Sequence, residues 1–302
     1  MVIWMISEIN KNFPEVFEEC MKEFVPQAGL DTPVIDEAVS YSLFGGGKRL
    51  RPMLMAVSYE AFSGRPWEEN RVLRAFMTAL EMIHTYSLIH DDLPAMDDDD
   101  MRRGKRTNHI VFGEDIAILA GDALLNGAFE VMSGALLTAD PDEARRGVRA
   151  LAYIAGCSGV RGMVGGQAID ISGYAWKENR LIDMYEKKTG CLLAAAMTAG
   201  SVLAGASQED VGRMEKCAFK TGVAFQVQDD LLDVTGDAEV IGKPVGSDEK
   251  RDQVTFVTLR GIEGAEKYAD ECLDEAMKCL EDISGDPAVL KKIIASLSGR
   301  RK

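Results

Sequence analysis

Two clusters of aspartate stand more than a hundred residues apart in this sequence, and each follows an apolar run of helical character. The first cluster, DDLPAMDDDD, begins at Asp91, and the second, DDLLD, begins at Asp229. Carboxylates repel one another, so a protein that gathers them usually binds cations there, and hard oxygen ligands suit magnesium, which bridges to phosphates. Basic residues follow both clusters, as RRGKR at 102–106 and as Gly242–Lys243. The pattern indicates a diphosphate substrate held through metal ions.

The spacing of the second cluster places its outer carboxylates on one side of a helix. Asp229 and Asp233 are four residues apart, so their side chains project from the same face one turn apart. Like charges in this arrangement destabilise a helix unless a cation lies between them. A solvated helix end is the simpler alternative, but the apolar residues around DDLLD would make an unusual solvent-exposed face. A metal site is the preferred interpretation.

The first cluster has a different geometry. Asp91 and Asp97 are six residues apart and do not align on one helix, and Pro94 interrupts the run. We therefore expect the helix to end near Leu93 and a turn to bring Asp97 back beside Asp91. Taken alone, the four aspartates at 97–100 are most simply a charged loop. Their pairing with the second cluster and with the basic residues that follow favours a metal site.

A glycine-rich basic segment lies upstream of both clusters. It reads GGGKRLRP over 45–52, and its glycines allow a close approach of the backbone. Lys48, Arg49 and Arg51 supply charge that can bind phosphate. The segment is not a P-loop, because no Ser or Thr follows the lysine. Alone it is a weak signal.

Two smaller features have both a functional and a structural interpretation. KKTG at 187–190 is a basic, hydroxyl-bearing break between helical stretches, and a helix C-terminus capped by Gly190 is a fair alternative. His84 lies seven residues before Asp91, two helical turns away on the same face. A lone core histidine is the usual interpretation, but this spacing favours a phosphate contact at least equally.

Composition limits the class of protein. The chain has 302 residues, of which 46% are hydrophobic, and a net charge of -15, which argues against a general nucleic-acid surface. The six cysteines lack metal-like spacing and are expected to be reduced, mostly buried thiols of a cytoplasmic protein. The apolar stretch at the N-terminus is cut off by Glu8, too early for a signal sequence or a membrane span.

Helical periodicity prevails almost throughout, and residues 1–302 are expected to form one all-α domain. The segments 71–90 and 191–206 are apolar on more than one face, so other helices should surround them. The short apolar run 254–259 looks extended, but such a run cannot separate helix from strand. The expected helices are 3–24, 34–44, 51–62, 67–93, 115–137, 141–157, 175–204, 208–234, 263–281 and 286–297.

The motifs taken together identify a family. In chain order they are GGGKRLRP, HDDLPAMDDDDMRRG, GGQAID, EKKTG, FQVQDDLLD and GKPVGSD, and as a set they resemble the trans-isoprenyl diphosphate synthases over about residues 40–260. The resemblance implies an all-helical bundle around a deep apolar cavity, in a homodimer. It also implies a reaction in which magnesium helps an allylic diphosphate to ionise. Isopentenyl diphosphate then attacks the allylic cation, and a proton leaves.

The resemblance also implies roles for particular residues. Three magnesium ions are implied, two bound by Asp91 and Asp97 and the third by Asp229, with Asp92 and Asp233 in support. The positions that match isopentenyl diphosphate contacts are Lys48, Arg51, His84 and Arg103. Those that match allylic diphosphate contacts are Arg102, Lys188, Thr189, Gln226 and Lys243. Oxygens around Lys188, Thr189 and Gln226 are also expected to steady the cation.

Two positions depart from the family pattern. Gln253 stands where a lysine is usual after the second cluster, which would weaken closure over the diphosphate unless Lys250 or Arg251 substitutes for it. Arg106 replaces the usual proline after RRGK. A non-catalytic partner subunit of a prenyltransferase therefore stays open as an alternative. A terpene cyclase is disfavoured, because DDLLD lacks the Asn/Asp–Ser/Thr–Glu pattern of those enzymes.

Product length depends on the helix that carries Asp91. Tyr86 lies five residues earlier, about 7.5 Å deeper along the helix axis, where its ring would form the floor of the cavity. This pattern resembles bacterial farnesyl diphosphate synthases, which extend dimethylallyl and geranyl diphosphates, so farnesyl diphosphate is the expected product. Met82 would form a second floor if Tyr86 tilted aside. A geranylgeranyl diphosphate synthase is the alternative, although such enzymes tend to have a smaller or more flexible residue here.

Overall fold

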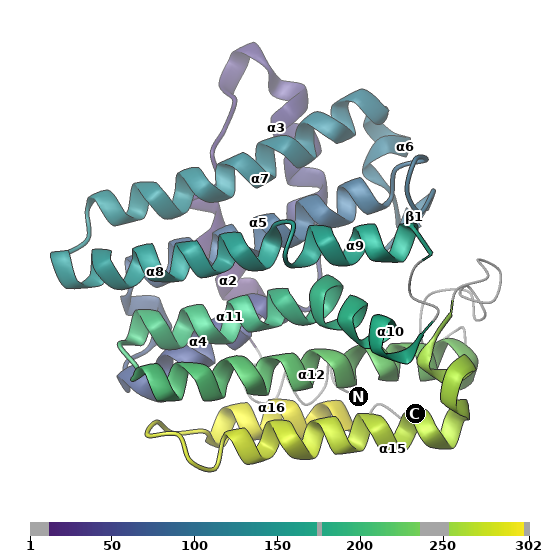
Figure 1. Ribbon diagram of the computed structural model, residues 1–302. Coiled ribbons are helices and arrows are strands. Elements are labelled where there is room, and N and C mark those ends of the chain that lie inside the picture. The colour runs from purple at the N-terminus through teal and green to yellow at the C-terminus, as the bar shows by residue number, and fades with distance from the viewer. Residues whose placement is uncertain (1–11, 174–176, 236–253, 299–302) are drawn as a thin grey trace.

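The computed structural model describes residues 12–173, 177–235 and 254–298, and the regular structure in these ranges is almost entirely helical. Figure 1 shows the long helices stacked in layers, from α7 (Glu114–Leu137) at the top to α15 (Phe256–Cys279) at the bottom. Within these ranges the sheet is limited to two short antiparallel strands, β1 (Met101–Arg102) and β2 (Lys105–Arg106). The expected all-α class is confirmed.

The other elements follow the expected order, with most boundaries shifted by a few residues; residues 3–11 of the first expected helix and 175–176 of the helix expected over 175–204 lie outside the described residues. These elements are α2 (Phe13–Lys22), α3 (Pro33–Leu43), α4 (Leu50–Ser63), α5 (Arg71–Asp91), α6 (Asn108–Phe112), α8 (Pro141–Ser158), α9 (Met163–Ile171), α10 (Glu178–Tyr185), α11 (Cys191–Ala204), α12 (Gln208–Thr235) and α16 (Ala288–Ser298). Short 3-10 turns lie at Gly29–Asp31 and Trp67–Glu69, and a π-helical turn, η3, lies at Glu186–Gly190.

Helix α5 begins four residues later than the expected segment 67–93. The side chain of Asn70 accepts a hydrogen bond from the Leu73 amide at 2.7 Å, which satisfies a free donor of the first turn and fixes the start of the helix. Residues Trp67–Glu69 form a separate 3-10 turn. The helix ends at Asp91, so the first aspartate cluster begins on its last turn.

Helix α11 lies at the centre of the bundle. Every residue from Cys191 to Leu203 is buried. Small residues allow this close packing, because a Cβ atom on Gly200 would lie 2.3 Å from the carbonyl oxygen of Met55 on α4. Helices α8 and α12 also pack against α11. The expectation of a central bundle helix in this segment is confirmed.

The expected single helix over 175–204 is interrupted by the turn η3. Gly190 has right-handed helical angles, φ −61° and ψ −40°, and α11 continues directly from it. A glycine that caps a helix C-terminus usually adopts positive φ. The alternative in which Gly190 ends a helix is therefore wrong, and KKTG is a widened turn inside a nearly continuous helical path.

Two segments differ from expectation because of local signals that periodicity does not carry. The run 254–259 enters α15 instead of a strand, since Thr255 and Thr258 exchange hydrogen bonds in a capping box. Gly261, with φ of 70°, kinks α15 after its first turn. Helix α9 is absent from the expected set, because two adjacent glycines interrupt its apolar pattern, and the short helix α6 is absent from it as well.

Helix α7 is the one helix of the described ranges that is long and apolar enough to cross a membrane by length and composition. It packs against α3, α5 and α8, as a core helix of a bundle does. Its remaining side carries apolar residues in contact with solvent, with Ile118 at 44% exposure and Leu119 at 51%. These two side chains form a short apolar strip on the outside of the helix, flanked by the exposed Asp115 and Asp122, and are a candidate contact surface.

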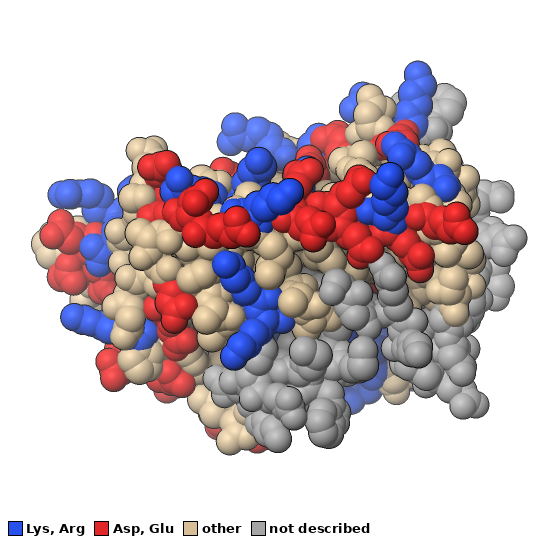
Figure 2. Space-filling view, turned by 90° about the horizontal axis from the view of Figure 1, so that it is seen from below, with Lys and Arg blue, Asp and Glu red and all other residues tan. Residues whose placement is uncertain are grey.

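Negative charge gathers on the face formed by the C-terminal helices. Figure 2, seen from below Figure 1, shows a band of Asp and Glu side chains with Lys and Arg among them. Exposed acidic residues of α15 include Glu263, Glu271, Asp274 and Glu275. Water solvates the charged side chains of such a surface, and their negative charge repels nucleic acid.

Candidate active site

A cavity of about 400 Å³ lies between α5, α9 and the turn η3. Its volume is in the range of small-molecule sites. Apolar side chains from α9 and α11 form much of its wall, including Met163, Val164, Ile171 and Leu192. It is also lined by six residues singled out in the sequence, which are Arg51, His84, Tyr86, Asp91, Lys188 and Thr189.

The first aspartate cluster folds back on itself as expected. The Asp97 amide donates a hydrogen bond to the Asp91 carbonyl at 2.9 Å, which closes the turn after α5. Burial raises the pKa of Asp91 to about 6; the Lys188 ammonium lowers it and the Asp97 carboxylate raises it. Two half-buried carboxylates held beside each other suit a divalent cation with a preference for oxygen ligands.

Asp92 has a different environment from Asp91. It is buried, and its Oδ1 accepts a hydrogen bond from Arg102 Nε at 2.6 Å and lies 2.5 Å from Arg102 Nη2. Arg102 also lies 3.6 Å from Asp99. These charged contacts fix the loop that follows α5. Asp92 thus supports the first cluster by holding Arg102 beside it.

Arg49 is part of the scaffold, which corrects the expectation that it supplies phosphate-binding charge. Its side chain is 2% exposed, and its guanidinium donates to Glu81 Oε1 at 2.8 Å and to Glu18 Oε1 at 2.7 Å. A third bond of 2.7 Å reaches the Leu43 carbonyl. The arginine therefore ties α2, α5 and the end of α3 together from the start of α4.

Three basic groups of the expected isopentenyl diphosphate site lie close together. Burial lowers the pKa of Arg51 to about 10, although Glu81 opposes this shift. The pKa of His84 is held well below its usual range, mainly by burial and to a lesser extent by the positive charges of Arg51 and Arg103. Lys48 is exposed on the preceding loop. Positive charge that depresses its neighbours' pKa values favours binding of an anion.

The glycines of GGGKRLRP let this loop meet Arg103. Arg103 adopts a left-handed backbone, with φ of 53°, and its Nη1 donates a hydrogen bond to the Gly46 carbonyl. A Cβ atom on Gly47 would lie 2.7 Å from the same nitrogen. The close approach of the guanidinium explains why a side chain is missing at Gly47, whereas Gly46 has a positive φ of 90° that disfavours other residues.

The turn η3 places Lys188 between α9 and the first aspartate cluster. Lys188 Nζ lies 2.5 Å from Asp170 Oδ2. Burial opposes the charged form, but the carboxylates of Asp170, Asp91 and Asp97 outweigh it and raise the pKa of Lys188. A Cβ atom on Gly166 would lie 2.3 Å from the Lys188 amide nitrogen, so α9 packs directly on the backbone of the turn.

The same turn contacts the helix of the second cluster. Thr189 Oγ1 donates a hydrogen bond to Gln226 Oε1 at 3.0 Å. Gln226 lies one turn before Asp229 and two turns before Asp233 on α12, so these side chains follow one another along the helix. The structure thus joins the two aspartate clusters through η3. Lys243 and Gln253, together with Lys250 and Arg251, lie outside the described residues.

Sequence reasoning assigned no roles in α9, although the segment GGQAID contributed to the resemblance. Gln167 lines the cavity, and neither its amide nitrogen nor its oxygen has a hydrogen-bond partner among the described residues. Asp170, one turn later, pairs with Lys188. In the sequence, the signal for this site is the pair of polar side chains Gln167 and Asp170, which lie three residues apart in an otherwise apolar segment.

Tyr86 lies in the cavity wall below Asp91. Its ring is 6% exposed and contacts the His90 ring edge-on, with 5.7 Å between the ring centroids. Met82, one turn further, is 1% exposed and does not line the cavity. A Cβ atom on Gly127 of α7 would lie 2.9 Å from Met82 Cε, so Met82 packs into α7 behind Tyr86.

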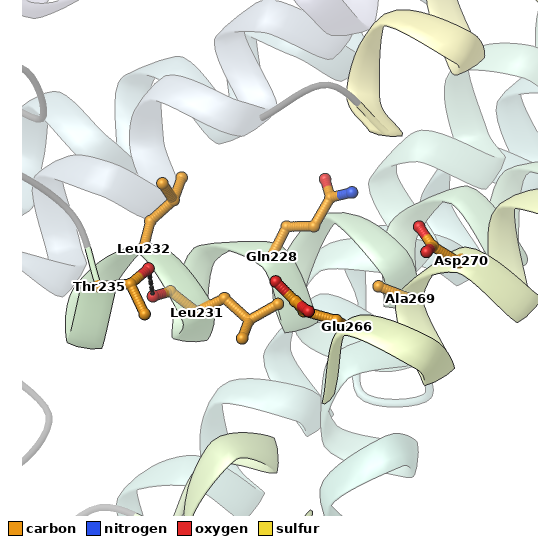
Figure 3. A pocket seen from close by; sticks show the side chains of 7 residues that line it. All are labelled: Gln228, Leu231, Leu232, Thr235, Glu266, Ala269 and Asp270. Atoms are coloured by element: carbon orange, nitrogen blue, oxygen red, sulfur yellow. Dashed lines mark hydrogen bonds between the residues drawn. The ribbon is translucent and has the colours of Figure 1, made fainter. Parts of the chain in front are cut away.

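A second, smaller hollow lies on the other side of α12. Figure 3 shows it between α12 and α15, and its volume is about 50 Å³. Gln228 Oε1 is buried there without a partner among the described residues, and Thr235 Oγ1 donates to the Leu231 carbonyl at 2.6 Å. The hollow is too small for a diphosphate substrate, so the larger cavity is the candidate site.

Comparison with known proteins assigns the chain to a family. The family model of the polyprenyl synthetases matches residues 32–297. The chain belongs to the polyprenyl synthetase family. This polyprenyl synthetase is 40% identical over 288 residues to the farnesyl diphosphate synthase of Escherichia coli (strain K12), a match that covers 90% of this chain and 93% of that protein.

Other relatives carry a different product in their names. The chain is 41% identical over 265 residues to the geranylgeranyl diphosphate synthase of Cyanophora paradoxa, covering 87% of this chain and 85% of that one. The crystal structure of geranylgeranyl pyrophosphate synthetase from Pyrococcus horikoshii is similar with a TM-score of 0.83 at 27% identity, over 99% and 98% of the two chains. The protein is therefore a short-chain trans-prenyltransferase, and its substrates are isopentenyl and allylic diphosphates.

Proposed function

We propose that this prenyltransferase joins isopentenyl diphosphate to dimethylallyl and then geranyl diphosphate and releases farnesyl diphosphate. The position of Tyr86 carries the proposal, because its buried ring lies in the cavity wall one to two turns below Asp91. The edge contact with His90 supports the ring in this position. A chain of fifteen carbons fills the space between the diphosphate end and this ring.

We assign the diphosphate end of the site to the two aspartate clusters and the basic residues around them. Asp91, Asp97 and Asp229 would hold magnesium, with Asp92 and Asp233 in support, and the carboxylate oxygens fit this metal. Magnesium, when bound, stabilises the negative charge of the leaving diphosphate. Arg102, Lys188 and Lys243 bind the allylic diphosphate, and Lys48, Arg51, His84 and Arg103 bind isopentenyl diphosphate.

The turn η3 has the second chemical role in this proposal. The hydroxyl of Thr189, which lines the cavity, bonds to the amide oxygen of Gln226, and their oxygen dipoles can steady an allylic cation. The apolar wall excludes water that would quench the cation. The released diphosphate then takes the proton that leaves the new prenyl chain.

A geranylgeranyl product is the second candidate. It is supported by relatives of 41% identity with that name. It requires Tyr86 to tilt aside, so that the growing chain reaches Met82.

We infer further that the whole chain acts as one all-helical domain in a cytoplasmic homodimer. The apolar strip of α7, which includes Ile118 and Leu119, supports this assembly, because contact with a second copy would remove it from water.

The test is to incubate the purified protein with magnesium, isopentenyl diphosphate and each allylic diphosphate in turn and to size the products. A main product of fifteen carbons agrees with the proposal, and one of twenty carbons supports the second candidate. No turnover with any allylic substrate would favour a non-catalytic partner subunit and contradict the proposal.

A further inference from the structure

The end of α10 and the turn η3 are joined to α12 by two hydrogen bonds that bracket Lys188 in the sequence. The Tyr185 hydroxyl donates to Asp230 Oδ2, and the Thr189 hydroxyl donates to Gln226 Oε1 at 3.0 Å. Tyr185 and Thr189 are four residues apart, and so are their partners Asp230 and Gln226. The two segments therefore run antiparallel, with one hydrogen bond on each of two successive turns. Lys188 therefore lies between two fixed points on the helix of the second aspartate cluster.

Glycines let neighbouring elements contact the backbone of this turn on two sides. A Cβ atom on Gly222 of α12 would lie 2.6 Å from the Gly190 Cα atom. A Cβ atom on Gly166 of α9 would lie 2.3 Å from the Lys188 amide nitrogen. The turn is thus enclosed between α9 and α12, and the side-chain hydrogen bonds set its position along α12.

Asp230 connects this arrangement to a third element. The residue is 3% exposed, and its Oδ2 also accepts a hydrogen bond from the Phe256 amide at 2.8 Å. Phe256 begins α15, and its ring stacks on Tyr268 with 4.5 Å between centroids. One buried carboxylate thus joins α12, the end of α10 and the start of α15, and burial makes each of these hydrogen bonds costly to lose.

We propose that Tyr185 and Asp230 are positioning residues for the allylic diphosphate. This inference rests on the proposed function, in which Lys188 and the metal at Asp229 hold the same diphosphate. Tyr185 precedes Lys188 by three residues, and Asp230 directly follows Asp229. The Tyr185–Asp230 hydrogen bond therefore sets the distance between the ammonium group and the metal-binding carboxylate, whereas the isopentenyl diphosphate groups on α4 and α5 do not depend on it.

The chain offers a matched control for the loss of one tyrosine hydroxyl. Tyr153 on α8 also donates to a carboxylate of α12, Glu215 Oε1, at 2.6 Å, and it does not line the cavity. Tyr185→Phe should raise KM for the allylic diphosphate about fivefold to tenfold, or about 1.0–1.4 kcal/mol of binding free energy, because Lys188 is no longer held at its distance from Asp229. KM for isopentenyl diphosphate should stay within twofold. Tyr153→Phe should lower Tm to a similar extent and leave both KM values unchanged.

A double variant tests whether the two residues act through one hydrogen bond. Asp230→Asn keeps an acceptor oxygen but loses the charge, so it should raise the allylic KM in the same direction as Tyr185→Phe. If one hydrogen bond is responsible, the fold-increase in allylic KM for the double variant will be smaller than the product of the fold-increases for the two single variants. Equal kinetics for Tyr185→Phe and Tyr153→Phe, or equal shifts in both KM values, would overturn the inference while prenyl transfer by the wild type stands. A wild type that forms no prenyl product would overturn the proposed function first.

Discussion

Arginines two positions apart in GGGKRLRP have different roles, and their substitution should separate binding from stability. Arg51→Gln should raise KM for isopentenyl diphosphate by about tenfold or more, because a charged contact to an anion is lost. Arg49→Gln should instead lower the free energy of unfolding by about 3–5 kcal/mol, since it leaves the buried Glu81 carboxylate without its partner. Steady-state kinetics and urea unfolding of both variants provide the measurement. A stability loss for Arg51→Gln as large as that for Arg49→Gln would contradict the division.

The metal-binding role of the aspartates is tested by removing one carboxylate from each cluster. Asp91→Ala and Asp229→Ala should each lower kcat by far more than tenfold, which corresponds to about 1.4 kcal/mol of barrier. Asp98→Ala, in the loop that follows α5 and exposed, is the control and should retain most activity. EDTA should silence the wild type, and excess magnesium should restore it. A loss below tenfold in either cluster variant would argue against a metal role there.

His84 should give the protein a measurable dependence on pH. Its folded-state pKa lies well below the unfolded value of about 6.5 because of burial and the nearby arginines. The unfolded chain therefore binds more protons in this window, and stability should fall as the pH drops from 7.5 to 5.5. His84→Gln removes this contribution, so its Tm should fall less over the same range. Parallel Tm profiles of the two proteins would show that His84 does not titrate in this way.

At the scale of elements, the wall of α5 should set the product length. Tyr86→Ala should lengthen the product beyond fifteen carbons with little loss of turnover, because no group at the diphosphate end is touched. Met82→Ala alone should leave the length unchanged, since Met82 lies behind Tyr86. The double variant should give the longest products. Chromatographic sizing of the products checks all three, and an unchanged product from Tyr86→Ala would move the floor to another helix.

Sequence reasoning was most successful where a pattern is local. The turn that returns Asp97 to Asp91 follows from a proline and a helix end, and the structure has it. The split of the segment 175–204 could not be predicted, because a π-helical turn depends on packing against α9 and α12 rather than on periodicity. The roles of Arg49 and Asp230 were also out of reach. Their partners, Glu81 and Tyr185, come close only in the folded chain.

At the scale of the whole molecule, the apolar strip of α7 should determine self-association. Leu119→Asp places a charge on the exposed side of this helix, so it should convert a dimer into monomers without unfolding the chain. Val148→Asp is the control, since Val148 is 59% exposed on α8. Light scattering after size exclusion measures both. A wild type that runs as a monomer, or a Leu119→Asp variant that stays dimeric, would place the assembly elsewhere.

The π-helical turn at Glu186–Gly190 also changes the rotation of α11 about its axis relative to α10. An α-helix advances by about 100° per residue, so one residue more in a turn rotates everything that follows by roughly that angle. This rotation lets α10 present Tyr185 to α12 while α11 packs against α4 and α8. A deletion of one residue here would preserve a continuous helix and yet turn Lys188 away from the first aspartate cluster. The number of residues in this turn therefore matters for the orientation of Lys188 as much as the residue types do.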